Sequence, residues 1–296
     1  LKPDNQLFNQ LFWKEFYVYI SKYIPHVLKG KSMKLKYDNI KWNVNNTVYK
    51  KWCEGKTGFP IVDAGMRELH ATGWMNQSVR MVVASFLCEV LNIDWRHGEK
   101  HFHQELIDTD ISINAMMWQN AGRSGIDQWN FFMSPVNASQ DPTGNYTKKW
   151  VPELQKLPLK FLHNPWNAPS NVLVNAGVIL GSTYPKRICL DITAARNNSK
   201  TAVLEMRRDN QAFNDEGGYD VILLPDGSRS RVFTRRDLRL NRDGSIKVFK
   251  GKKRTKNEGK KAKKKTKNKI AKDNNQKSIK SFFAISTTTV TKKIKS

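Results

Sequence analysis

This chain has few cysteines and lacks long apolar runs. These two features argue against a disulfide framework, a zinc site built from cysteines and a membrane span. Three cysteines, Cys53, Cys88 and Cys189, are spread over 296 residues. An odd number at wide spacing forms neither a disulfide framework nor a zinc pattern, and it favours a reducing compartment. No run of about 20 apolar residues occurs, so the sequence predicts no membrane-spanning segment. The sequence also lacks a P-loop, a zinc ribbon and a hydrolase nucleophile elbow.

Acidic residues are few relative to basic ones. The chain holds 51 Lys and Arg against 26 Asp and Glu, a net charge of +25. Residues 251–296 contain 17 of these bases and only 2 of the acids, and the preceding part of the chain is basic as well. Positive charge in both parts predicts a polyanionic partner such as nucleic acid, rather than a mere solubilising tail.

The first 170 residues carry apolar side chains at helical spacing. The sequence predicts helices over residues 4–27, 60–73, 75–92, 97–107 and 109–121. No alternating strand pattern precedes residue 180. Pro60 is tolerated in a first helical turn, and Gly73 is a suitable helix terminus. This part of the chain is therefore expected to be all-α.

The later regions have a different character. Residues 130–170 are rich in loop-forming residues, with one short helix expected near 150–155. Residues 219–250 alternate apolar and polar side chains and contain the turn sequences "PDG" and "RDG". This pattern predicts a small β-hairpin appendage. From Gly251 the chain is Lys-rich and is expected to be disordered.

The segment "DTDISINAMMWQNAG" (108–122) places two acids among large apolar residues. Asp110, Asn114 and Trp118 follow one another at intervals of four, which puts them on one face of a helix. A carboxylate, an amide and an indole in one half-buried row suggest a binding partner. Spacing alone leaves a second interpretation equally open, in which the acids are helix caps and surface residues.

Four motifs resemble the FAD-binding domain of the cryptochrome/photolyase family. They are "WCEGKTGFPIVDAGMRELHATGWM" (52–75), the segment 108–122, "DPTGNYTKKWVPELQKLP" (141–158) and "HNPWNAP" (163–169). The resemblance implies an all-α domain that holds FAD, over residues 1–187. A C-terminal extension with a β-hairpin (188–250) and a disordered basic tail (251–296) are expected to follow. The family's activities imply blue-light chemistry on DNA or in signalling.

Two parts found in relatives are not in this sequence. One is the N-terminal α/β antenna domain, and the other is a Thr/Ser-rich loop that contacts the FAD phosphates. The opening sequence "LKPDNQLFNQLFWKEF" is typical of a helix entered midway through a protein. The chain is therefore expected to be a fragment or the product of a truncated gene.

The resemblance also implies a set of flavin contacts. Asp108 is expected to pair with Arg80 beside the ring, because either charge alone would be costly to bury. Asp110 is expected to hydrogen-bond the polar edge of the ring. Asn114 matches the position that faces flavin N5, where plant cryptochromes carry Asp and many photolyases carry Asn. An amide is not a ready proton donor, so Asn at this position favours an anionic flavin.

Three tryptophans match the family's electron relay. Trp118 lies one helical turn after Asn114, Trp95 lies in "NIDWRHGE", and Trp42 lies in "NIKWNV". A lone Trp usually serves core packing. Because all three relay positions are Trp, the resemblance implies stepwise electron transfer from Trp42 through Trp95 and Trp118.

The residues expected to face DNA give a mixed signal. By resemblance, Trp13 would stack on a flipped base, and Lys14 replaces the usual Arg, keeping the charge but losing the bidentate fork. The other positions on this face are Gln10, Tyr17, Gln77 and Met81. Gln10 replaces a Glu that contacts the cyclobutane dimer in photolyases, and Asn120 replaces a second stacking Trp.

Further substitutions at this face restrict the type of DNA lesion that the chain is expected to repair. Gln77 stands in place of Asn, and Ser78 stands in place of Arg. The paired His of (6–4) photolyases is missing, since Asn76 and Gln77 follow "WM". Repair of (6–4) lesions is therefore not expected.

The histidines of "RHGEKHFHQE" offer an alternative site. His97 and His101 lie one helical turn apart, a spacing that suits a metal ion. We predict no metal here, because this segment matches a family stretch without a metal role and surface histidines are common.

The tail contains one motif that is independent of photochemistry. "QKSIKSFF" (276–283) places Gln276, Ile279, Phe282 and Phe283 in the pattern that resembles the sliding-clamp docking peptide of eukaryotic replication and repair enzymes. A short helical turn would gather the three apolar residues into one plug. The basic runs at 251–254 and 260–265 suit nuclear import, which predicts a nuclear protein. A chance match in a biased tail is the alternative.

Three functions follow from these observations. The first is an FAD-dependent DNA photolyase, a carbon–carbon lyase that splits cyclobutane pyrimidine dimers by electron transfer from reduced FAD. The second is a cryptochrome-like blue-light photoreceptor without repair activity. The third is a DNA-binding remnant without flavin.

Overall fold

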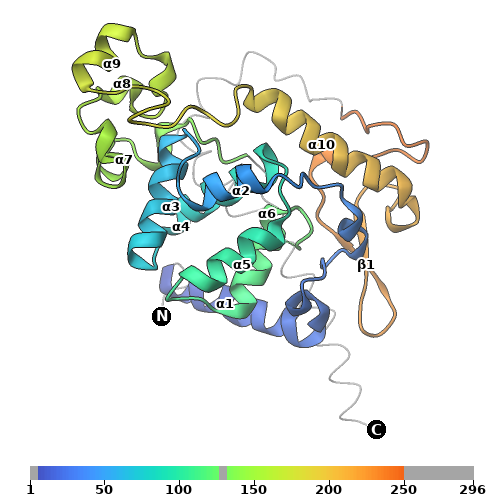
Figure 1. Cartoon of the computed structure of the whole chain (residues 1–296). Helices are drawn as coiled ribbons and strands as arrows, with labels where there is room; N and C mark the ends of the chain where they lie inside the picture. Colours follow the sequence, from blue (N-terminus) through green and yellow to red (C-terminus); the bar gives the residue numbers. More distant parts are fainter. Residues whose placement is uncertain (1–5, 127–131, 250–296) are drawn as a thin grey trace, which may run out of the picture. The chain divides into compact units, whose positions relative to one another are not determined.

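The structure is a computed structural model that describes residues 6–126 and 132–249 (Figure 1). Residues up to Lys247 form one compact unit. The predicted disordered tail and its motif at Gln276, Ile279, Phe282 and Phe283 lie outside the described residues.

Helices dominate the described residues. In chain order they are α1 (Gln6–Tyr23), α2 (Asn46–Cys53), α3 (Pro60–Thr72), α4 (Gln77–Ser85), α5 (Trp95–Glu105), α6 (Ile111–Ala121), α7 (Asn145–Trp150), α8 (Leu159–Leu162), α9 (Ser170–Ala176) and α10 (Ile192–Asp209). Within the described residues the first strand is β1 (Asp220–Leu223), which confirms the all-α prediction for the preceding part. In this part of the chain, no helix combines the length and the apolar character needed to cross a membrane.

Capping side chains explain where several helices begin and end. Asp94, Asp110 and Asp191 each precede a helix and accept a backbone N–H from its first turn, at α5, α6 and α10. Such a cap satisfies one of the donors that a helix start leaves without a partner. Gly73 ends α3 in the left-handed region with φ 68°, as predicted, because glycine adopts this conformation without a steric cost.

The apolar stretch predicted as one helix over 75–92 has a change of helix type within it. After α4, the turn Phe86–Val90 is π-helical. This turn carries Glu89, whose buried carboxylate lies 3.1 Å from both Arg123 and Arg235. A π-helical turn holds one extra residue, and apolar periodicity alone does not reveal it.

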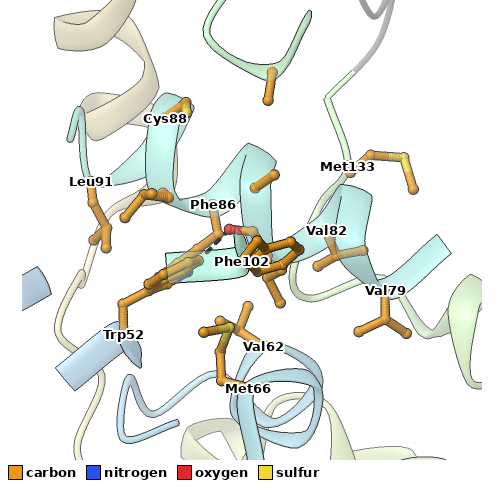
Figure 2. Close-up of a cluster of buried hydrophobic side chains, with 14 of the residues drawn as sticks. Trp52, Val62, Met66, Val79, Val82, Phe86, Cys88, Leu91, Phe102 and Met133 are labelled. Carbon is orange, nitrogen blue, oxygen red and sulfur yellow. Dashed lines mark hydrogen bonds between the residues drawn. The ribbon is translucent and has the colours of Figure 1, made fainter. Parts of the chain in front are cut away.

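A large hydrophobic cluster is formed mainly by α2 to α6, and Figure 2 shows part of it. Trp52, Phe86 and Phe102 are buried in this cluster, together with Trp95 and Trp118. Two glycines allow the close packing around these indoles. A Cβ at Gly98 would collide with the Trp118 ring, and a Cβ at Gly122 would collide with the Trp95 ring.

The part after residue 187 contains a helix that the sequence did not predict. The first half of α10, "ITAARNNSK", is too polar to show a helical apolar stripe. The predicted hairpin is confirmed, since β1 pairs antiparallel with β2 (Arg229–Val232), from Asp220 opposite Val232 to Leu223 opposite Arg229. The predicted domain boundary at 187 stays a prediction.

Candidate cofactor and DNA-facing site

Two acids in the loop between α5 and α6 form ion pairs with residues of two other helices. Arg80 of α4 donates to both carboxylate oxygens of Asp108, at 3.1 and 2.9 Å. Lys14 of α1 places its ammonium 3.6 Å from the Asp110 carboxylate. The expected pairing of Arg80 with Asp108 is thus present. The pair is not buried as expected, because Asp108 stands in a connecting loop and its side chain is 46% exposed.

Asp110 explains why an acid stands among large apolar residues. Its Oδ1 atom accepts the backbone N–H groups of Ser112 and Ile113 at 3.0 and 3.1 Å, so it caps α6. The capping interpretation of this acid is therefore correct. It does not exclude a ligand, since a carboxylate has about four acceptor positions and these bonds leave some of them free.

Asn114 has a partner that the sequence did not suggest. Its Nδ2 atom donates to the backbone oxygen and to the Oε1 atom of Glu99, at 3.0 and 3.1 Å. The reversed amide would bring its oxygen against the Glu99 carbonyl, so the observed orientation is favoured and the Oδ1 atom points away from Glu99. Burial raises the pKa of the Glu99 carboxyl. Two facing helices form this contact, and the sequence separation of fifteen residues gave no signal for it.

Trp118 and Trp95 are almost completely buried, and Trp42 packs at the edge of the same cluster. The Trp118 ring meets Phe102 edge-on, with centroids 4.9 Å apart. The Arg96 guanidinium carbon lies 4.7 Å from the centroid of the Trp95 ring. The structure therefore gathers the three expected relay tryptophans in and around one cluster.

Trp52 is a further aromatic contact of Trp118 that the sequence did not single out. The two rings meet edge-on with centroids 6.1 Å apart, and the Trp52 indole donates to the Val83 carbonyl oxygen at 3.1 Å. His101 packs against Trp52 at 5.6 Å, and His97 packs against Tyr49 at 5.2 Å. The two histidines considered as metal ligands thus contact aromatic rings. In residues 6–126 and 132–249, no three metal-binding side chains gather at one point.

The residues expected to face DNA lie on α1 and α4. Gln10 and Lys14 of α1 are exposed, and Trp13 is half-buried. Tyr17 is buried, and its ring packs against the Trp13 indole with the two centroids 5.6 Å apart. On α4, Gln77 is exposed and Met81 is half-buried.

Asn120, which replaces a stacking Trp of relatives, does not reach this surface. It is buried at the end of α6, 2% exposed. A Cβ on Gly125 would collide with its amide oxygen, so the chain folds closely over this side chain.

The chain resembles proteins of known class in sequence. A family profile described as the FAD binding domain of DNA photolyase matches residues 7–205. The deoxyribodipyrimidine photo-lyase of Agrobacterium fabrum is 40% identical over 203 residues, which cover 67% of this chain and 42% of that protein. Cryptochrome-1 of Arabidopsis thaliana is 44% identical over 162 residues, which cover 52% of this chain and 24% of that protein.

The fold is similar to solved structures as well. A bacterial class III photolyase from Agrobacterium tumefaciens matches with a TM-score of 0.66 and 38% identity, over 69% of this chain and 42% of that chain. The chain spans about two fifths of the length of these photolyase relatives. The family match ends inside α10, so β1 and β2 lie beyond it.

Proposed function

This chain belongs to the DNA photolyase and cryptochrome family as an FAD-binding domain, and from that premise we propose that it repairs cyclobutane pyrimidine dimers in DNA under blue light. The observation that carries this proposal is the ion pair between Lys14 and Asp110, at 3.6 Å. It brings the helix with Trp13 next to the loop expected to contact the flavin. A base stacked on Trp13 would then lie near the cofactor, as direct electron transfer requires.

The side chains at the α5–α6 loop fit a flavin ring. The polar edge of that ring carries both N–H donors and carbonyl acceptors, and Arg80, Asp108 and Asp110 offer both kinds of partner. These three side chains are 20 to 46% exposed, so the described residues leave them accessible to a ligand. The Asn114 amide oxygen completes the set at the position expected for flavin N5.

When bound, FAD supplies the absorption of blue light and the electron that splits the dimer. The chain's own residues bind and orient the substrate. Trp13 stacks on the flipped base, and Lys14 neutralises a phosphate. Gln10 and Gln77 hydrogen-bond the base edges, with Met81 as an apolar contact. Asn114, held by Glu99, would offer its amide oxygen as an acceptor at the position expected for flavin N5, and as an amide it is not a ready proton donor.

The relay has a supporting role in repair. An electron moves inward when Trp118 is refilled by Trp95 and Trp95 is refilled by Trp42. This transfer keeps the cofactor reduced and does not touch DNA. Replacement of Trp118 by Phe should therefore abolish photoreduction of oxidised FAD, measured by loss of flavin absorbance, while FAD stays bound. Photoreduction at the wild-type rate in Trp118→Phe would exclude this relay.

A cryptochrome-like photoreceptor without repair activity is the second candidate. The buried Asn120 favours it, because this position does not supply a second stacking ring for a flipped dimer. Gln10 favours it too, since it lacks the carboxylate that contacts the dimer in photolyases. The relay suits both functions and does not decide between them.

A single repair assay separates the two candidates. The chain loaded with chemically reduced FAD should restore a duplex with one thymine cyclobutane dimer under blue light. Trp118→Phe should repair equally well, because the electron for repair does not pass through Trp118. Trp13→Ala should weaken binding of the damaged duplex by about 1–3 kcal/mol, the usual range for loss of a base-stacking aromatic.

Trp150 provides a matched control for this assay. It is a half-buried indole on α7, a helix that contributes nothing to the proposed site. Trp150→Ala should leave lesion binding unchanged. If the loaded wild-type chain photoreduces FAD but leaves the dimer intact, the photoreceptor is the correct function.

The tail adds a separate proposal about recruitment. A nuclear protein that reaches replicating DNA would use Gln276, Ile279, Phe282 and Phe283 to dock on the sliding clamp. A peptide of residues 270–290 should bind the clamp with micromolar affinity, and replacement of Phe282 and Phe283 by Ala should remove binding. A wild-type peptide that fails to bind would leave the tail as a basic extension only.

A further inference from the structure

The segment after the family match packs on the part of the chain that carries Trp42. This segment, residues 206–247, is termed the C-terminal cap, and it belongs to the same compact unit as the helices. We propose that the C-terminal cap controls the outer end of the tryptophan relay by keeping the Trp42 indole N–H away from water. This proposal rests on the relay part of the proposed function.

A hydrophobic cluster joins the C-terminal cap to the segment that carries Trp42. Tyr37 and Ile40 contribute from the segment just before Trp42. Met206, Leu238 and Leu240 contribute from the C-terminal cap, with Val203 and Leu204 of α10. All of these side chains are buried, and Trp42 packs against the cluster they form. The stretch that carries Trp42 is therefore held against the C-terminal cap by apolar burial.

A buried ionic cluster fixes the same stretch. The Asp220 carboxylate of β1 accepts the Tyr37 hydroxyl at 2.8 Å and lies 3.2 Å from the Lys34 ammonium. The Lys36 ammonium is 2.7 Å away, and Arg207 of α10 also pairs with this carboxylate. Three cations share one carboxylate with almost no solvent contact, so loss of Asp220 would leave them without a counter-charge.

A second buried ion pair ties the C-terminal cap to the core around the relay. Arg235 lies 3.1 Å from Glu89 in the π-helical turn, and Arg123 lies 3.1 Å from the same oxygen. Arg123 directly follows Gly122, whose backbone lies against the Trp95 ring. The C-terminal cap is thus anchored near both Trp42 and Trp95.

Trp42 is half-buried, and its indole nitrogen belongs to the enclosed part of the side chain. Its Nε1 atom has no contact with solvent and no hydrogen-bond partner in the described part of the chain. A buried indole N–H usually finds a partner, so this exception calls for an explanation. In the relay, the enclosure of this N–H has a chemical consequence.

When Trp42 gives one electron to Trp95, the hole remains on Trp42 as a radical cation. Loss of the Nε1 proton to water makes this step irreversible, because it leaves a neutral tryptophan radical that an external thiol can later reduce. With Nε1 enclosed, water is not in contact with this proton. Return of the electron from Trp95 to Trp42 then competes, and net transfer is slow. Opening of the C-terminal cap should make net transfer faster.

The first experiment needs neither light nor FAD. Hydrogen exchange of the Trp42 Nε1–H is followed by NMR on the full chain, with Trp42→Phe to assign the signal. Leu240→Asp places a charge inside the hydrophobic cluster, and we expect exchange at least about tenfold faster, as local opening predicts. Leu223→Asp is the matched control, because Leu223 is on the same segment but 56% exposed. Leu240→Ala gives a milder opening if Leu240→Asp does not fold.

The second experiment measures photoreduction of the chain loaded with oxidised FAD, with and without a thiol. Leu240→Asp or Leu240→Ala should photoreduce several-fold faster than wild type when thiol is present, and Leu223→Asp should not. Backbone amides of β1 and β2 report opening of the cap. If these amides exchange faster and the Trp42 indole does not, the cap does not cover Trp42 and the proposal fails.

Two further outcomes separate the proposal from its premise. If the indole exchanges faster, photoreduction is unchanged and Trp42→Phe still slows photoreduction, the relay exists and the cap does not control it. If Trp42→Phe has no effect on photoreduction, the relay assignment itself is wrong and the proposal fails with it.

Discussion

Two pairs of carboxylates in this molecule have opposite surroundings. Asp108 and Asp110, at the loop before α6, are partly exposed, and each pairs with one cation in the part of the chain that the structure describes. Asp220 and Glu89 are buried, and each is surrounded by three cations. The first pair retains capacity for a ligand, whereas the second pair is committed to holding the chain together.

The pKa shifts express the same difference. Burial alone would raise the pKa of the Asp220 carboxyl, but Lys34, Arg207 and Lys36 outweigh it and hold this pKa below its usual value. Burial likewise opposes ionisation of Glu89, and Arg123 and Arg235 lower its pKa. Both buried carboxylates are therefore ionised at neutral pH, and their contribution is structural.

The largest effect should come from Asp220→Asn. The amide cannot balance Lys34, Lys36 and Arg207, so we expect the free energy of unfolding to fall by about 3–5 kcal/mol, the usual cost of breaking a buried ion pair. Urea denaturation followed by circular dichroism measures this change. Asp226→Asn, in the exposed turn of the hairpin, is the control and should change little. Equal stability of the two variants would contradict the structural role of Asp220.

Glu89→Gln should have a smaller effect than Asp220→Asn. The Gln side chain keeps an acceptor oxygen for Arg123, and Arg235 retains Asp237 as a partner at 3.0 Å. We expect a loss of about 1–3 kcal/mol, in the range for a hydrogen bond to a charged group. The same denaturation assay tests it. A loss as large as that of Asp220→Asn would show that the two clusters do not differ in this way.

The lysines at Asp220 predict a pH effect of intermediate size. Burial lowers the pKa of Lys34 and Lys36 to about 8, from 10.5 in the unfolded chain. Between pH 8 and 10 the unfolded chain binds more protons, so the free energy of unfolding should rise with pH, on the order of 1 kcal/mol per pH unit. Below pH 8 both states are protonated and the effect vanishes.

Other groups at this cluster limit the pH window. Asp220 and Arg207 keep their charges throughout it, and Tyr37, whose pKa is raised by burial, opposes the trend only above about pH 10, the usual tyrosine pKa. Lys34→Met should remove part of the slope, since one titrating group is lost. Identical pH profiles for wild type and Lys34→Met would refute the assignment.

The sequence predicted the helices of the domain better than the contacts between them. The helix with Asp110, Asn114 and Trp118 follows from a spacing of four, and the end of α3 follows from Gly73, because both signals are local. The partner of Asn114 was not predictable, since Glu99 reaches it across a helix pair and no sequence pattern records that approach. The exposure of Asp108 also depends on the surrounding fold.

The C-terminal cap shows the same limit more strongly. The turn sequence "PDG" predicted the hairpin, because turn chemistry is local. Just before the C-terminal cap, the polar first half of α10 concealed a helix whose second half is buried in one cluster with the distant residue Tyr37. The cluster at Asp220 combines Lys34, Lys36 and Arg207 from distant segments, so charge patterning along the chain gave no indication of it.

Asp108→Asn should have the smallest effect on stability and a clear effect on the cofactor. Its ion pair with Arg80 is partly exposed, and such pairs contribute about 1 kcal/mol or less, so urea denaturation without FAD should show little change. FAD affinity should fall roughly tenfold or more, because Arg80 is no longer held beside the ring by a charge-assisted hydrogen bond. Titration with FAD, followed by flavin fluorescence, measures this affinity. Asp226→Asn again serves as the control with unchanged affinity. A variant that loses stability as Asp220→Asn does, with FAD affinity intact, would reverse the comparison and remove Asp108 from the flavin site.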